Sequence, residues 1–132
     1  MTIITYTNQK DILHPDELKT LIEQSLDADK AVNIMSIKLN DQSGLADYMI
    51  IASGTSSRHV SALADNVINK LNQKGIKSIT VEGKTQADWV AIDIGDIIVH
   101  LFRPEVRDFY GIEKMWGTFK PYEVVAGQHL QA

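Results

Sequence analysis

The segment Trp89–Phe102, WVAIDIGDIIVHLF, contains two runs of β-branched and aromatic residues separated by Gly95 and Asp96. A two-residue loop of this composition between two such runs predicts an antiparallel β-hairpin. The loop also sets the pairing of the two strands, and one face of the hairpin is then wholly aliphatic. We expect that face to lie in the core. Its members are Val90, Ile92, Ile94, Ile97, Val99 and Leu101.

The opposite face of this hairpin mixes large aromatic rings, a histidine and a carboxylate. It pairs Trp89 with Phe102, Ala91 with His100, and Asp93 with Ile98. Such a composition suits contact with either a covering helix or a partner protein. A shift of one residue in the register would exchange the two faces, so this assignment depends on the turn.

In the sequence before the hairpin, the spacing of apolar residues predicts two helices and three strands. Pro15 can begin the first helix, because its missing N–H would have no partner there, and the apolar spacing ends near Asp27. The second helix follows residues 54–57, whose hydroxyls can cap it, and ends at Gly75. Alternating or continuous apolar runs predict strands at Ala31–Leu39, Asp47–Ala52 and about 79–81. The Asp47–Ala52 run is apolar on both faces, as an inner strand would be.

After the hairpin, Pro104 ends the strand, and residues 105–116 have the apolar spacing of a helix interrupted by Gly111. Little order is expected beyond Tyr122. The order of elements, α-β-β-α-β-β-β-α, predicts an α/β fold with a mixed sheet flanked by helices. We expect one domain over residues 15–117, preceded by a loose arm at 1–14 and followed by a tail at 118–132.

The composition limits the classes of function. The chain has 132 residues, a formal net charge of −4 and no cysteine. This charge argues against bare nucleic acid as the main contact and favours a basic protein partner. Without cysteine, disulfides, thiolate catalysis and sulfur-ligated metals are excluded. No apolar run approaches the about 20 residues of a membrane span, and no leader is evident, so a cytoplasmic location without membrane contact is expected.

Motifs for catalysis or cofactors are weak. Gly54-Thr55-Ser56-Ser57 before a helix could cradle a phosphate, but a strand-to-helix turn with a hydroxyl cap is the favoured interpretation. Asp93 and Asp96 could hold Mg²⁺, although turn chemistry explains Asp96. The histidines are scattered, and no serine lies in a GxSxG motif. We therefore expect no enzyme activity, no cofactor and no metal site.

Four sequence blocks together resemble the ribosomal silencing factor family, also called the iojap-like family. In chain order they are DYMIIASGTSSRHV (47–60), EG (82–83), ADWVAIDIGDIIVHLF (87–102) and EVRDFYGIEKMW (105–116). The match covers roughly residues 18–116. The resemblance implies a fold related to the nucleotidyltransferases but without their catalytic carboxylates. It also implies a repressor that binds ribosomal protein L-fourteen on the large ribosomal subunit, blocks association with the small subunit, and lowers translation when nutrients are limiting.

The resemblance and the mixed face of the hairpin together nominate a set of partner-binding residues. Trp89 would be the anchor, Asp93 and Glu82 would meet cations, and residues around the last helix would extend or support the surface. Arg107 also fits a solvated helix face. The full set is Glu82, Trp89, Asp93, His100, Phe102, Arg107, Tyr110 and Trp116.

Three alternatives stay open at the level of the sequence. One is a nucleotide-binding or nucleotidyltransferase-type enzyme of the same fold, based on the turn at 54–57. Another is a scaffold that binds a different basic protein. The third concerns assembly: a homodimer when the protein is off the ribosome.

Overall fold

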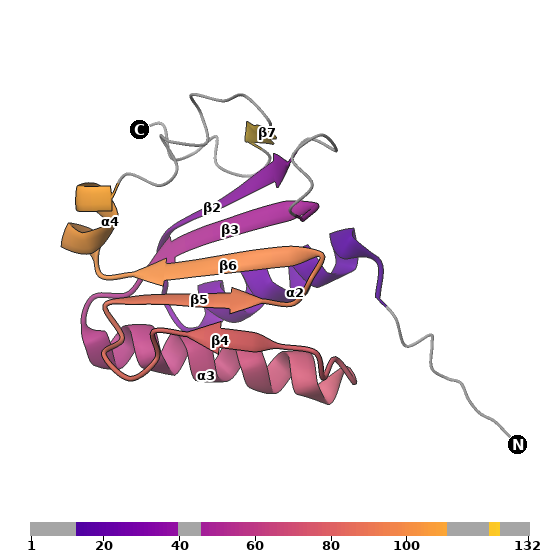
Figure 1. Ribbon diagram of the computed structural model, residues 1–132, viewed down its shortest axis with the longest axis horizontal. Helices are drawn as coiled ribbons and strands as arrows, with labels where there is room; N and C mark the ends of the chain where they lie inside the picture. The colour runs from indigo at the N-terminus through magenta and orange to yellow at the C-terminus, as the bar shows by residue number, and fades with distance from the viewer. Residues whose placement is uncertain (1–12, 40–45, 111–121, 125–132) are drawn as a thin grey trace, which may run out of the picture.

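The computed structural model describes residues 13–39, 46–110 and 122–124. Figure 1 shows a twisted sheet with two long helices behind it and a short helix at one end. The elements in chain order are α2 (Pro15–Ala28), β2 (Val32–Leu39), β3 (Tyr48–Ser53), α3 (Ser57–Gln73), β4 (Thr80–Glu82), β5 (Trp89–Asp93), β6 (Ile97–Phe102), α4 (Pro104–Tyr110) and β7 (Tyr122–Val124).

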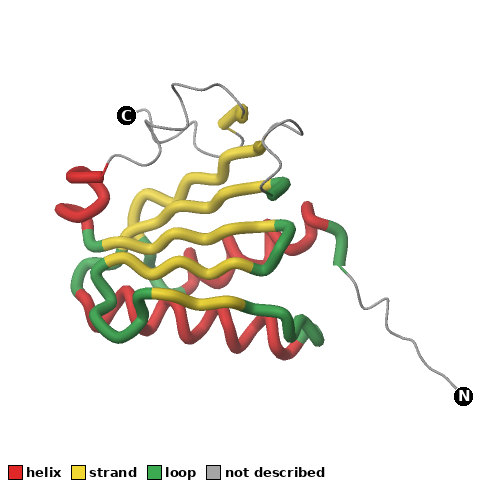
Figure 2. Tube along the Cα trace, viewed as in Figure 1, coloured by secondary structure: helices red, strands yellow, loops and turns green. Residues whose placement is uncertain are grey.

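The sheet has six strands in the order β4-β5-β6-β3-β2-β7. Neighbouring strands are antiparallel except β3 and β6, which run parallel. Figure 2 shows that α2 and α3 lie together on one face of this sheet. The predicted α/β class, with a mixed sheet flanked by helices, is confirmed. Among the described residues, no helix combines the length and the hydropathy needed to cross a bilayer.

The hairpin has the predicted register. Its strands pair Trp89 with Phe102, Ala91 with His100, and Asp93 with Ile98. The turn is closed by the Ile94 N–H, which donates to the Ile97 carbonyl at 3.1 Å. The aliphatic face lies in the main core, between the sheet and the two long helices, as predicted.

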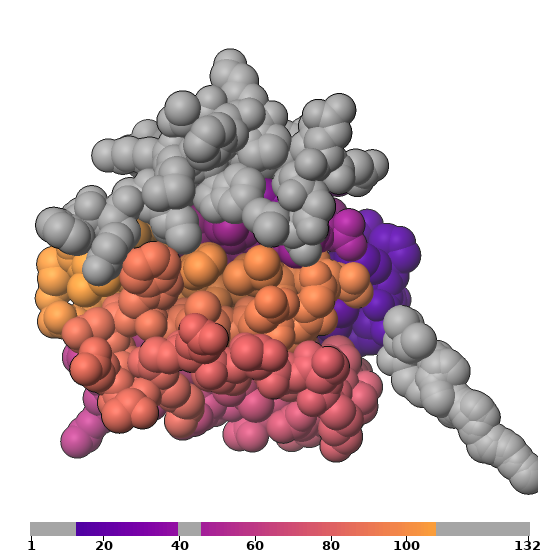
Figure 3. Space-filling model, in the orientation of Figure 1, coloured from indigo at the N-terminus to yellow at the C-terminus, as the bar shows by residue number. Residues whose placement is uncertain are grey.

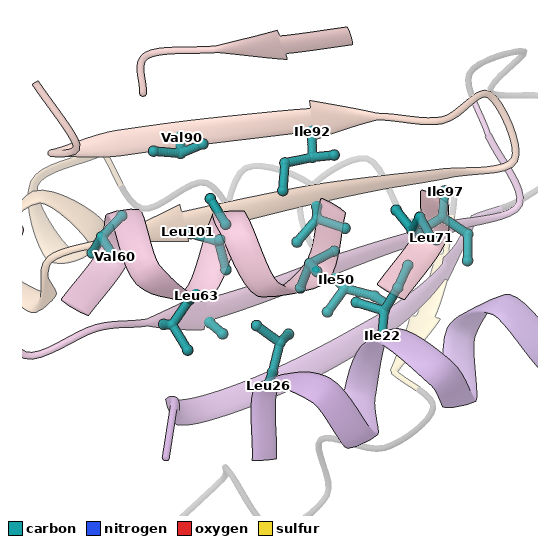
Figure 4. Packing of buried hydrophobic residues seen from close by; sticks show 14 of the residues in the cluster. Ile22, Leu26, Ile50, Val60, Leu63, Leu71, Val90, Ile92, Ile97 and Leu101 are labelled. Atoms are coloured by element: carbon teal, nitrogen blue, oxygen red, sulfur yellow. The ribbon is translucent and has the colours of Figure 1, made fainter. Parts of the chain in front are cut away.

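That core is formed by apolar side chains from both helices and from the five strands β2, β3, β4, β5 and β6. Figure 4 shows helix residues such as Ile22, Leu26 and Leu63 pointing toward strand residues such as Ile50, Ile92 and Leu101. These side chains are almost completely excluded from solvent. Burying each contributes roughly 1.5 to 3 kcal/mol to folding, so the core fixes which face of the sheet is covered.

The helices begin and end where local chemistry allows. At the start of α2, the side chain of His14 accepts from the Asp16 N–H, and the Glu17 carboxylate accepts from the His14 N–H, which is a capping box. At the start of α3, the Ser56 hydroxyl accepts from the His59 N–H at 3.1 Å. The predicted hydroxyl cap is confirmed, and so is the left-handed Gly75 (φ +86°) after α3.

Two expectations differ from the structure. A strand was not predicted at Tyr122–Val124, yet β7 pairs there with the outer part of β2. The last helix begins at Pro104, one residue earlier than predicted, because proline is favoured in the first turn. Residues 1–12 of the predicted arm and the continuation of the last helix through 116 lie outside the described residues.

Candidate functional site

The second face of the sheet, opposite α2 and α3, carries the residues that the hairpin pattern singled out. We call the part of it formed by β4, β5 and β6 the hairpin face, and its members are Thr80, Glu82, Trp89, Ala91, Asp93, Ile98, His100 and Phe102. Figure 3 shows this side of the molecule, where atoms of β4, β5 and β6 reach the surface. Neither of the two long helices covers it.

Three rings form a compact cluster on the hairpin face. The centroids of Trp89 and Phe102 lie 4.9 Å apart, those of Trp89 and His100 5.8 Å, and those of His100 and Phe102 6.0 Å. Phe102 has no exposed surface, whereas Trp89 and His100 are partly buried. Phe102 therefore supports the other two rings from beneath.

His100 is held as a neutral imidazole. The indole Nε1–H of Trp89 donates to its Nδ1 at 2.9 Å, and burial lowers the pKa of His100 from 6.5 to about 4. Because Nδ1 accepts a hydrogen bond, the proton of the neutral ring is on Nε2. The ring is thus a fixed neutral tautomer at physiological pH.

This burial of His100 predicts that the free energy of unfolding decreases as the pH is lowered. In the unfolded chain the imidazole takes up its proton near its ordinary pKa of 6.5, but in the folded chain only near a pKa of about 4. Between these two pKa values the unfolded chain binds one more proton than the folded chain. The free energy of unfolding is therefore at its full value above about pH 6.5 and decreases as the pH falls. We expect a loss of about 2 kcal/mol between about pH 7.5 and pH 5.

Chemical denaturation across this pH range, on the wild type and on His100→Asn, would measure the effect. The variant should lack this part of the slope, while the remaining histidines and carboxylates contribute equally to both proteins. Parallel stability profiles for the two proteins would contradict the expectation.

The two carboxylates of the predicted set are exposed on the hairpin face. Glu82 of β4 lies opposite Ala91, and Asp93 lies at the end of β5. One oxygen of Asp93 accepts from the Gly95 N–H at 2.8 Å, so this side chain also stabilises the turn. In the described part of the chain, no three His, Asp or Glu side chains gather in a way that could hold a metal ion.

Arg107 lies in a different environment from the one predicted. The expectation of a solvated helix face is wrong, because the residue is 6% exposed. Its Nη1 donates to the Asn33 carbonyl at 2.9 Å and to the Ser53 hydroxyl at 3.0 Å. Asn33 has a left-handed backbone (φ +53°) within an irregularity between β2 and β3 that turns its carbonyl toward α4. Arg107 therefore anchors α4 to the end of the sheet.

The last two members of the predicted set cannot be placed. Tyr110 is the final residue of α4, and its side chain is not described. Trp116 lies outside the described residues. Their roles as partner contacts stay predictions.

The turn before α3 uses its own hydrogen-bond donors. The Gly54 N–H donates to the Phe102 carbonyl at 2.9 Å, and the Thr55 N–H donates to Nδ1 of His59 at 2.9 Å. The other ring nitrogen of His59 contacts the Asp29 carbonyl at 2.9 Å. The imidazole thus lies where a phosphate would have to receive the Thr55 N–H, which favours the capping interpretation over a nucleotide site.

Comparisons with known proteins agree with this fold. The model of the family described as "ribosomal silencing factor during starvation" matches residues 13–131, which extends past both ends of the 18–116 segment that carries the sequence resemblance. The chain is 50% identical over 103 residues to the ribosomal silencing factor RsfS of Zymomonas mobilis, covering 78% of this chain and 77% of that protein.

Two further similarities are consistent with the first. The RsfS of Haemophilus influenzae is 39% identical over 99 residues, covering 75% of this chain and 97% of that protein. A crystal structure of a protein from Chromobacterium violaceum superposes with a TM-score of 0.77 at 36% identity, covering 80% of this chain and 88% of that chain.

Proposed function

Because this chain belongs to the family of ribosomal silencing factors, we propose that it represses translation by keeping the ribosomal subunits apart. In this proposal it binds the large subunit through ribosomal protein L-fourteen, and its bulk prevents association with the small subunit. Translation is lowered in this way when nutrients are limiting. The mechanism is steric, so it makes and breaks no covalent bond and needs no cofactor or metal, and it operates in the cytoplasm.

The hairpin face is the observation that supports this proposal most directly. It combines partly exposed rings, Trp89 and His100, with two exposed carboxylates, Glu82 and Asp93. Aromatic anchors supply much of the affinity of protein interfaces, and charge complementarity guides the encounter. The formal net charge of −4 fits a basic ribosomal protein better than it fits RNA.

The proposal assigns different roles to the predicted residues. Trp89 is the anchor, while Glu82 and Asp93 face cationic side chains of the partner. Phe102 and Arg107 act indirectly, because both are buried, the first under the rings and the second between α4 and the end of the sheet. Tyr110 and Trp116 extend the surface.

Replacing Trp89 with alanine is expected to weaken binding to the large subunit by about 2 kcal/mol, roughly thirtyfold. The change removes the ring that packs on Phe102 and the donor that orients His100. Sedimentation of purified large subunits with the protein, followed by addition of small subunits, measures both binding and the block of association. The variant should bind less and permit more joined ribosomes.

Leu21→Ala is a matched control for this experiment. Leu21 is also partly buried and apolar, but it lies on α2, on the opposite side of the sheet. The control should bind as well as the wild type after equal folding is shown by circular dichroism. Wild-type binding by a folded Trp89→Ala protein would refute the assignment of the anchor. Unimpeded subunit joining by the wild type would refute the proposed function itself.

A further inference from the structure

The single N–H of the Trp89 indole forms a hydrogen bond within the hairpin face. It donates to Nδ1 of His100 at 2.9 Å, across the pair of strands β5 and β6. Since an indole has no second donor and no acceptor, Trp89 offers a partner its ring surface rather than a hydrogen bond of its own. Any polar recognition by this pair has to come from His100.

His100 has one hydrogen-bonding group left to offer. Its Nδ1 is occupied as an acceptor, so the proton is on Nε2, which has no hydrogen-bond partner among the described residues. In the described part of the chain, the one side-chain polar atom that is fully enclosed without a partner is the hydroxyl oxygen of Ser25. Nε2–H of His100 is therefore not fully enclosed, and it is a donor of defined position.

The surroundings of this donor set the chemistry of what it can bind. The residues opposite His100 on the neighbouring strands are Ala91 and Ile51, which offer no hydrogen bond from their side chains. Among the described residues of the hairpin face, the charged groups are the carboxylates of Asp93 on β5 and Glu82 on β4. Two carboxylates disfavour an anionic partner group at this place, so an uncharged oxygen is the best match for the donor.

We propose that His100 is a specificity-determining residue whose Nε2–H donates to an uncharged acceptor of the protein partner, such as a main-chain carbonyl oxygen. Trp89 is the positioning residue that fixes the tautomer required for this contact. The inference rests on the proposed function, because it concerns the surface that would meet the ribosomal protein. Burial, which lowers the pKa of His100 to about 4, keeps the donor neutral throughout the neutral pH range.

Two amide variants separate the two roles of the imidazole. In His100→Asn the side-chain oxygen can take the place of Nδ1 and accept from Trp89, but nothing reaches the position of Nε2. In His100→Gln the longer side chain places an amide N–H near the position of Nε2, but the acceptor for Trp89 is lost. Each protein is first compared with the wild type by thermal unfolding, and its affinity for purified large subunits is then measured.

We expect His100→Asn to bind the large subunit about tenfold more weakly than the wild type, and His100→Gln to recover most of that loss. Wild-type affinity for His100→Asn would overturn the inference, because the outward donor would then be unnecessary. Equal losses in the two variants would also overturn it, because the ring would then act only through its contact with Trp89.

Trp89→Phe gives an independent measurement if an amide variant fails to fold. It keeps a ring on Phe102 but leaves Nδ1 of His100 without its donor, so the imidazole can exchange tautomers. Binding should weaken by about threefold, and unchanged binding would overturn the role of Trp89 in fixing the tautomer.

If the wild type fails to bind large subunits, the proposed function fails and the inference with it. If the wild type binds large subunits and the variants bind them with the same affinity, only the inference fails.

Discussion

Replacing Gly83 with alanine is expected to destabilise the fold by about 4 kcal/mol, more than alanine at any other glycine that the structure describes. Gly83 follows β4 with a left-handed backbone (φ +84°), and a Cβ atom built there would lie 2.1 Å from the carbonyl oxygen of Trp89. The obstacle is backbone rather than a movable side chain. The strand that carries Trp89 would have to shift, so the hairpin face would be distorted as well.

Gly95→Ala is the matched control for this prediction. Gly95 also has a left-handed backbone (φ +92°), but nothing lies within 4 Å of a Cβ built on it. The control therefore has the cost of the backbone conformation alone, about 1 to 2 kcal/mol. Urea denaturation of the two variants measures the difference. Equal losses of stability in the two variants would contradict the prediction, because the clash with the Trp89 carbonyl would then add no measurable cost.

Replacing Arg107 with methionine is expected to lower the free energy of unfolding by about 3 kcal/mol. Methionine keeps most of the apolar stem, so the loss reports on the guanidinium group. Without this group, the Asn33 carbonyl and the buried Ser53 hydroxyl lose their donor. Buried polar groups that lose a charged hydrogen-bond partner cost much more than surface ones. Arg107→Lys should recover only part of the loss, because a lysine lacks the planar fork.

Arg103→Met provides the comparison for Arg107, since it lies at the same end of the sheet. Arg103 pairs with Asp88 at 2.9 Å and with Glu105 at 2.7 Å, but its side chain is 31% exposed. Exposed ion pairs contribute about 1 kcal/mol or less. The midpoint of thermal unfolding should therefore be well below that of Arg103→Met for the Arg107→Met variant. The reverse order would contradict the anchoring role of Arg107.

The elements set by local chemistry are the ones that the sequence predicts well. The loop at Gly95 and Asp96 determines the register of the hairpin, and Ser56 and Gly75 mark the ends of α3. From the register follows the identity of the hairpin face, because successive side chains of a strand point to opposite sides. The same reasoning places Trp89, His100 and Asp93 together before any coordinates are known.

The features that depend on distant parts of the chain are not predictable in this way. Arg107 has the sequence surroundings of a surface helix, and only the left-handed Asn33, far earlier in the chain, provides the carbonyl that it binds. The hydrogen bond that fixes His100 depends on the rotamers of two rings that lie diagonally across β5 and β6. Likewise, β7 is a short strand whose partner is β2, and three residues carry too little pattern to reveal it.

The single parallel pair in the sheet, β3 with β6, bears on how the protein reaches its native state. The hairpin β5–β6 and the helix α3 involve contacts close in sequence, so they can form early. Tyr48–Ser53, by contrast, must find Ile97–Phe102 after the whole of α3, β4 and β5 has been synthesised. Closing that long loop costs entropy before any contact repays it. We therefore expect the docking of the hairpin against β3 to limit the rate of folding, and the aliphatic face of the hairpin to be exposed to aggregation until it occurs.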